Sequence, residues 1–155
     1  MKRILLWALS LLPVLMLGTS GNTIYDWLLG LVAGGRAHML IALTPEAVFM
    51  HRATTIGSLI LLGLSLGLAM RQCLRPALAS RRPLSLLALG GLVAGTMAVT
   101  VIGLRGHVQA IAGPQVADAS IEIAAIPLYL AGLIPAACLL AAAALLAQLG
   151  KRANA

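Results

Sequence analysis

Charged residues are scarce in this chain: they make up 10% of its 155 residues, and only four of them are acidic. A soluble domain of this size usually contains about 25% charged residues. Hydrophobic residues make up 61% of the chain, and their runs are continuous rather than alternating, which argues against a membrane β-barrel. The composition therefore predicts an all-α membrane protein with a single integral domain over residues 1–155.

The sequence also lacks the motifs of several enzyme classes. It contains no Gly-rich phosphate-binding loop, nucleophile elbow, His-Glu-x-x-His motif or Cys-x-x-Cys motif. Its two cysteines, Cys73 and Cys138, fall in a linker and in the last apolar run, so we expect them at different membrane depths and unpaired. These absences make an enzyme the less favoured interpretation.

Most basic residues gather in three short segments. Eight of the eleven lie at the N-terminus, in the 71–82 linker and at the C-terminus: Lys2, Arg3, Arg71, Arg75, Arg81, Arg82, Lys151 and Arg152. The positive-inside rule predicts that all three segments are cytoplasmic. Topology thus accounts for the net charge of +7 without a nucleic-acid partner. We expect a multi-pass protein of the bacterial inner (cytoplasmic) membrane, N-in and C-in.

The apolar runs predict four membrane-spanning segments. Residues 1–20 fit a signal anchor or a cleavable signal peptide, and cleavage would leave three spans. Residues 22–50 read as a periplasmic or interfacial segment, because Tyr25, Asp26 and Trp27 combine aromatic rings with a charge; a re-entrant or spanning segment is the alternative. Transmembrane helices are expected at 45–71, 83–105 and 121–149.

Two small-residue motifs suggest how the middle helices pack. Gly63-x-x-x-Gly67 and Gly91-x-x-x-Gly95 are of the kind that lets membrane helices approach closely. A helical hairpin with its turn near Ala77 would place Gly63 opposite Gly91. The same hairpin would place His51 and His107 at a similar membrane depth.

Three histidines, His38, His51 and His107, are the only ones in the chain, and all map to the outer side. Ionisable groups near the hydrocarbon are costly, so they are candidate functional residues. A b-type haem would use His51 and His107 as its two ligands, with Arg52 and Arg105 near its propionates. A quinone pocket would use a histidine and an arginine as hydrogen-bond donors.

Two further interpretations of the same residues remain open. A Cu or Zn site would use His38, His51 and His107 with the carboxylate of Glu46. Alternatively, histidine and arginine side chains at helix ends act as simple anchors that extend to the lipid headgroups.

The stretch from His51 to Gly57, followed by Ser58–Met70 and Arg71, resembles the helix of bacterial membrane cytochromes b in which a histidine and a later glycine precede a Leu-rich run. This resemblance covers about 20 residues and implies a four-helix bundle that transfers electrons between quinol and haem. Two bis-histidine haems need four histidines, whereas this chain has three. The resemblance therefore implies at most one outer haem, held by His51 and His107.

The chain's small size and Gly-rich spans favour a non-catalytic accessory or assembly subunit of a larger membrane complex. Its expected partners are the bilayer and other membrane subunits or further copies of itself. The alternative is an electron-transfer protein with one haem or quinone site, or a Cu- or Zn-binding membrane protein.

Overall fold

The computed structural model describes residues 2–33, 45–112 and 127–152. Within these ranges the chain is helical, as the composition predicts. The helices are α1 (Lys2–Thr19), α2 (Gly21–Ala33), α3 (Pro45–Cys73), the 3-10 helix η2 (Pro76–Arg81), α4 (Arg82–Ala112) and α5 (Leu130–Arg152). His38, Asp118 and Glu122 lie outside the described residues.

Three of these helices are long and apolar enough to cross a membrane: Pro45–Cys73, Arg82–Ala110 and Leu130–Gly150. At 1.5 Å per residue each exceeds or equals the ~30 Å of hydrocarbon in a bilayer. Helix α1 contains a shorter apolar stretch, Ser10–Thr19. The prediction of a helical membrane protein is therefore supported by three candidate spans.

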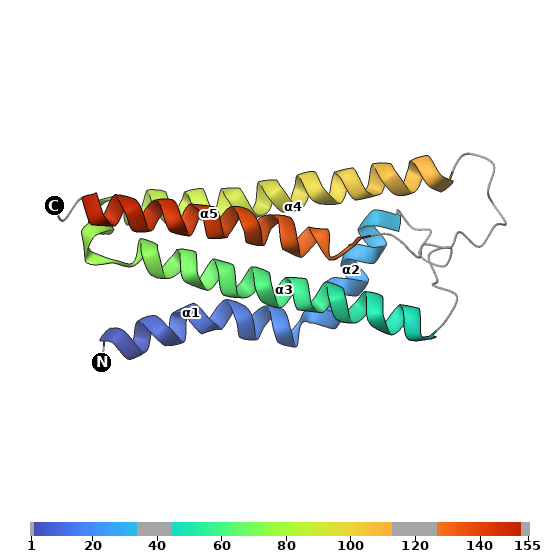
Figure 1. Ribbon diagram of the computed structural model, residues 1–155, viewed down its shortest axis with the longest axis horizontal. Coiled ribbons are helices and arrows are strands. Elements are labelled where there is room, and N and C mark those ends of the chain that lie inside the picture. Colours follow the sequence, from blue (N-terminus) through green and yellow to red (C-terminus); the bar gives the residue numbers. More distant parts are fainter. Residues whose placement is uncertain (1, 34–44, 113–126, 153–155) are drawn as a thin grey trace.

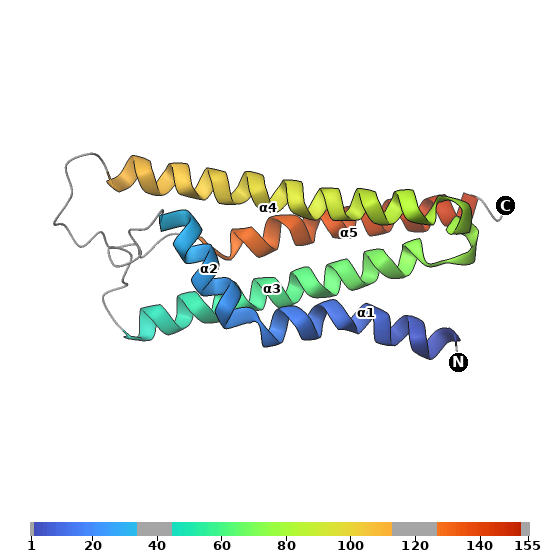
Figure 2. The same cartoon turned by 180° about the vertical axis from the view of Figure 1, so that it is seen from behind.

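The long helices form an elongated bundle in which α3 packs most extensively against α5 on one side and α1 on the other. Helix α4 lies beside α5, and α2 crosses from α1 towards α4 (Figures 1 and 2). The N-terminal end of α1, the η2 linker and the C-terminal end of α5 all lie at one end of the bundle (Figure 1). We call this the basic end, and the opposite end the loop end.

Helices α1 and α2 follow α3 in one continuous antiparallel register. Short turn geometry at Ser20 joins them, with its N–H donating to the Met16 carbonyl at 3.0 Å and its carbonyl accepting from Ile24 at 2.9 Å. The neighbours across the interface are Trp7 and Arg71, Ser10 and Gly67, Val14 and Gly63, Gly21 and Ile56, and Tyr25 and His51. Residues 2–25 therefore lie along α3 as a broken helix, and the rest of α2 continues towards α4.

The predicted contact between Gly63 and Gly91 is wrong. A Cβ atom built on Gly63 would lie 2.9 Å from the Cα of Val14, and one on Gly67 would overlap the Ser10 carbonyl oxygen, so α1 covers this motif. A Cβ on Gly91 or on Gly95 would meet nothing within 4 Å. The motif in α3 does bring two backbones together, but the partner is α1.

Helix α5 begins later than the expected 121–149 span. Pro127 lies in a turn, and its carbonyl accepts the Leu130 N–H at 2.8 Å. Proline has no backbone N–H and disfavours helix in the preceding residue, so a helix start after Pro127 is the low-energy arrangement. From there α5 packs closely on α3, where Gly132 contacts Ser58 without room for a Cβ.

The main core lies between α3 and α5, with one contribution from α4. Its buried apolar members are Leu59, Leu62, Ala69, Cys73, Leu89, Ala136, Leu139 and Ala143. Both cysteines are free, as expected from their positions in the sequence.

Candidate functional site

Four side chains from α2 and α3 meet near the loop end of the bundle. The Tyr25 hydroxyl and His51 Nδ1 are joined by a hydrogen bond of 3.0 Å. Their rings pack edge to face, with centroids 5.7 Å apart and planes at 74°. Arg52 Nη2 donates to Asp26 Oδ1 at 3.0 Å, and its guanidinium lies 5.0 Å from the centre of the Tyr25 ring. We call these four residues the α2–α3 polar cluster.

Two neighbouring residues on each helix form this cluster. Tyr25 and Asp26 are consecutive on α2, and His51 and Arg52 are consecutive on α3. The first residues of the two pairs meet, Tyr25 with His51, and so do the second residues, Asp26 with Arg52. Gly21 brings the helices close one turn below, where an added Cβ would lie 3.1 Å from Ile56 Cγ2.

Burial differs sharply between the members of the cluster. Tyr25 is only 5% exposed, whereas the side chains of Arg52 and Asp26 are 42% and 61% exposed. Burial raises the pKa of the Tyr25 phenol; the Arg52 cation opposes this rise, and the Asp26 carboxylate adds to it. Ion pairs this exposed contribute little stability, so we expect the part-buried Tyr25–His51 contact to contribute more than the Arg52–Asp26 pair.

Arg52 is held from more than one direction. Its Nη2 pairs with Asp26, its face covers an aromatic ring, and its Nε is buried with no hydrogen-bond partner among the described residues. Cation–π contacts of partly desolvated arginines contribute about 1 kcal/mol. The arrangement positions α2 on α3 and orients the His51 ring.

Helix α2 separates His51 from α4. Tyr25 contacts His51 on one side and belongs on the other to a buried cluster with Leu104, Val108 and Leu128. His107 and Arg105 are exposed on the last turns of α4. The cluster therefore brings together His51 and Arg52 with α2, and not the expected set of His51, Arg52, Arg105 and His107.

The metal-site residues are dispersed in the part of the chain that the structure describes. Glu46 is exposed in the first turn of α3, His107 is on α4, and His38 lies outside the described residues. Among the described residues, no three His, Cys, Asp or Glu side chains gather around a common point. The haem, quinone and Cu/Zn hypotheses remain predictions, to be tested by a visible spectrum and metal analysis of the purified protein.

A second cation–π contact ties α1 to α3 at the basic end. The Arg71 guanidinium lies 4.1 Å from the centre of the Trp7 ring. With Gly63 and Gly67 between them, the Arg71 contact and the polar cluster attach the N-terminal helices to α3 at both ends. These contacts therefore hold the N-terminal helices on α3.

Sequence reasoning assigned Tyr25 and Asp26 to the membrane interface but missed that they pair with His51 and Arg52. A signal was present: Tyr-Asp and His-Arg are dipeptides with complementary hydrogen-bonding and charged groups. Nothing in the sequence, however, marks which helix lies against α3. Comparisons of this chain with protein-family models, curated proteins and solved structures find no match.

Proposed function

We propose that this chain is a non-catalytic accessory subunit of a membrane complex, which binds a transmembrane helix of another subunit on the outward face of α4. The observation that carries this proposal is an uncovered small-residue motif. Gly63-x-x-x-Gly67 in α3 is covered by α1, whereas a Cβ on Gly91 or Gly95 would meet nothing within 4 Å.

Helix α4 is also the least covered of the three candidate spans. Only 11% of its most apolar window is buried, against 44% in α3 and 33% in α5. We define the α4 outer face as the exposed residues that recur on one side of the helix: Leu84, Leu87, Ala88, Gly91, Ala94, Ala98 and Ile102.

The shape of this face suits a helix. Four small residues lie in its middle, and large apolar side chains lie at its two ends, where Leu84 is 67% and Ile102 is 69% exposed. In a bilayer, helix association depends on close van der Waals packing, because lipid tails are as apolar as leucine. The small side chains in the middle of the α4 outer face would let a partner helix approach closely enough for that packing.

The arrangement of charge supports an inner-membrane location with N-in and C-in topology. The basic end carries the three segments that hold eight of the eleven basic residues, and the positive-inside rule assigns such an end to the cytoplasm. In this topology α1, extended by the first turn of α2, supplies a fourth crossing. Tyr25 and the rest of α2 then lie at the outer boundary.

The experiment is site-specific photo-crosslinking in intact membranes. A photoreactive residue in place of Ala94 should give one discrete adduct, either with another membrane protein or with a second copy of this chain. Gly91→Leu should abolish the adduct, because a branched side chain on the α4 outer face would keep the partner helix from approaching closely.

Gly57→Leu is the matched control. Gly57 is exposed on α3, and a Cβ there also meets nothing within 4 Å, so this variant adds the same side chain to a different face and should leave the adduct intact. The proposal fails if the Ala94 probe gives only lipid adducts, or if Gly91→Leu and Gly57→Leu have the same effect.

A further inference from the structure

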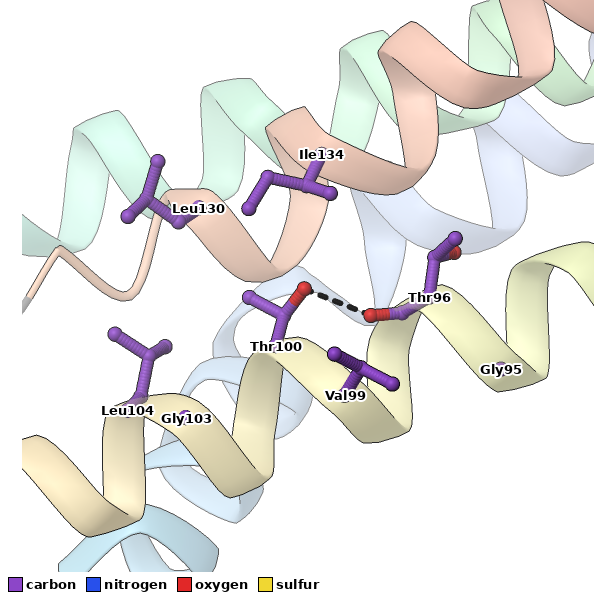
Figure 3. Close-up of a pocket in the computed structure, with 8 residues that line it drawn as sticks. All are labelled: Gly95, Thr96, Val99, Thr100, Gly103, Leu104, Leu130 and Ile134. Atoms are coloured by element: carbon purple, nitrogen blue, oxygen red, sulfur yellow. Dashed lines mark hydrogen bonds between the residues drawn. The ribbon is translucent and has the colours of Figure 1, made fainter.

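A groove of about 460 Å³ runs between α4 and α5 (Figure 3). Residues of α4 form one wall, and Leu130 and Ile134 of α5 form the other. Thr100 and Leu104 are buried at its floor, at 8% and 6% exposure, while Val99 is exposed at its rim. Its lining residues are Gly95, Thr96, Val99, Thr100, Gly103, Leu104, Leu130 and Ile134, and we call it the α4–α5 groove.

The polar groups in the lining of the α4–α5 groove are not available to a ligand. The two hydroxyl groups in its lining donate to carbonyls of their own helix, Thr96 Oγ1 to Leu92 O at 2.6 Å and Thr100 Oγ1 to Thr96 O at 2.7 Å. Figure 3 shows the second of these bonds. With both donors used internally, the lining selects a hydrocarbon chain over a polar ligand.

The position of the groove matches one leaflet of a bilayer. Gly95 lies close to the middle of the candidate span Arg82–Ala110, and Leu104 lies nine residues nearer the loop end. At 1.5 Å per residue this is about 14 Å, roughly half of the ~30 Å hydrocarbon thickness. On α5 the groove is bounded by the first residues of the span Leu130–Gly150.

A polar side chain marks the loop end of the groove. His107 is one turn beyond Gly103 on the same side of α4, and it is exposed. Helical side chains lean towards the N-terminus, so we expect His107 to reach back towards Gly103 at the edge of the groove. The α4–α5 groove is apolar and about one leaflet long, and a hydrogen-bonding group follows at its interfacial end. These properties match a lipid with an apolar chain and a polar headgroup.

We propose that the α4–α5 groove binds one acyl chain of a phospholipid from the leaflet at the loop end, with the phosphodiester headgroup beside His107. A phosphodiester needs only one donor at this position. A quinone ring would need donors for two carbonyl groups, and the hydroxyl groups of the lining both donate to their own helix.

The groove borders the subunit contact proposed above, and Gly95 belongs to both, but Gly103 and Gly91 probe them separately. Gly103 follows Gly91 by twelve residues, which places the two about 120° apart around the helix axis. A Cβ on either glycine meets nothing within 4 Å, so a side chain can leave the backbone at both positions without a clash at its first atom. Each position therefore serves as the control for the other.

The test is native mass spectrometry of protein released from nanodiscs of phosphatidylethanolamine and phosphatidylglycerol, after a mild delipidating wash. The wild-type chain should retain about one phospholipid, and Gly103→Leu should reduce retention by about tenfold, equivalent to ~1.4 kcal/mol. Gly91→Leu should retain lipid like the wild type while losing the Ala94 crosslink. Thermal unfolding of both variants checks that the bundle is intact.

His107 provides a second measurement. His107→Ala should lower phospholipid retention several-fold, and His107→Gln should restore part of it by supplying an amide donor. The proposal is overturned if the wild type retains no phospholipid, if Gly103→Leu retains as much as Gly91→Leu, or if the retained molecule is an isoprenoid quinone. Loss of the Ala94 crosslink in Gly103→Leu, with lipid retained, would instead assign the groove to the partner subunit.

Discussion

The interface between α1 and α3 gives the sharpest test of the packing. Replacing Gly67 by alanine adds one methyl group at a point where it would overlap the Ser10 carbonyl oxygen. This obstacle is backbone, so it cannot rotate aside as a side chain would, and α1 must move away. Overpacking of this kind costs about 1–3 kcal/mol.

Gly91→Ala is the matched comparison, because a Cβ there meets nothing within 4 Å. Both substitutions gain similar helix propensity, up to about 1 kcal/mol in water, so the difference between the variants isolates the packing cost. We expect Gly67→Ala to be about 2 kcal/mol less stable than Gly91→Ala.

The assay is reversible unfolding in mixed micelles of mild detergent and dodecyl sulfate, monitored by tryptophan fluorescence. Trp7 is useful here because it contacts Arg71 across the same interface, and its emission should change before the global transition in Gly67→Ala. Equal stability of the two variants would refute the reasoning, because α1 would then not be seated on Gly67.

Three further predictions concern the contacts that attach the N-terminal helices. Since burial raises the pKa of Tyr25 above its usual ~10, the folded state holds this proton more tightly. The contribution of Tyr25 to the free energy of unfolding should be constant below pH ~10 and should fall as the pH rises through the folded-state pKa. Tyr25→Phe should remove this part of the fall in a thermal-unfolding series. An unchanged slope would contradict the assignment. A double-mutant cycle on Asp26 and Arg52, each changed to alanine, should give a coupling energy below about 1 kcal/mol that shrinks in high salt; a larger, salt-insensitive value would mean that the pair is more buried than described. Trp7→Leu should lower the free energy of unfolding by about 0.5–1 kcal/mol through its contact with Arg71. If Trp7→Leu costs as much in an Arg71→Gln background as in the wild type, the ring and the cation do not interact.

Hydropathy and charge were sufficient to predict the three long helices and the gathering of basic segments at one end. These signals are local, since each apolar run and each Arg-rich segment depends on its own residues and on the surrounding lipid. The start of α5 was less accessible. The apolar run continues through Ile121–Ile126, whereas the described helix begins only at Leu130, because Pro127 forms a turn before it.

The candidate site was predicted only in part. His51 and Arg52 were identified as ionisable residues near the membrane boundary, but Tyr25 was assigned to the interface without a partner. A single ionisable residue in an apolar segment is enough to indicate an energetic cost. A hydrogen bond such as the one between Tyr25 and His51 can be predicted only when the neighbouring helices are known. The α4–α5 groove is of the same kind, because it exists only once two helices have been placed together.

The sequence by itself predicted an all-helical chain with three long segments apolar enough to cross a membrane, and three basic segments that lie at one end. The tertiary structure alone decided that Gly63 and Gly67 bind α1 and that Gly91 and Gly95 stay uncovered. The physical reason is that a small-residue motif specifies a close approach without specifying a partner. Only the shape of the opposing backbone, here the turn that contains Ser10, Pro13 and Val14, selects between equivalent motifs.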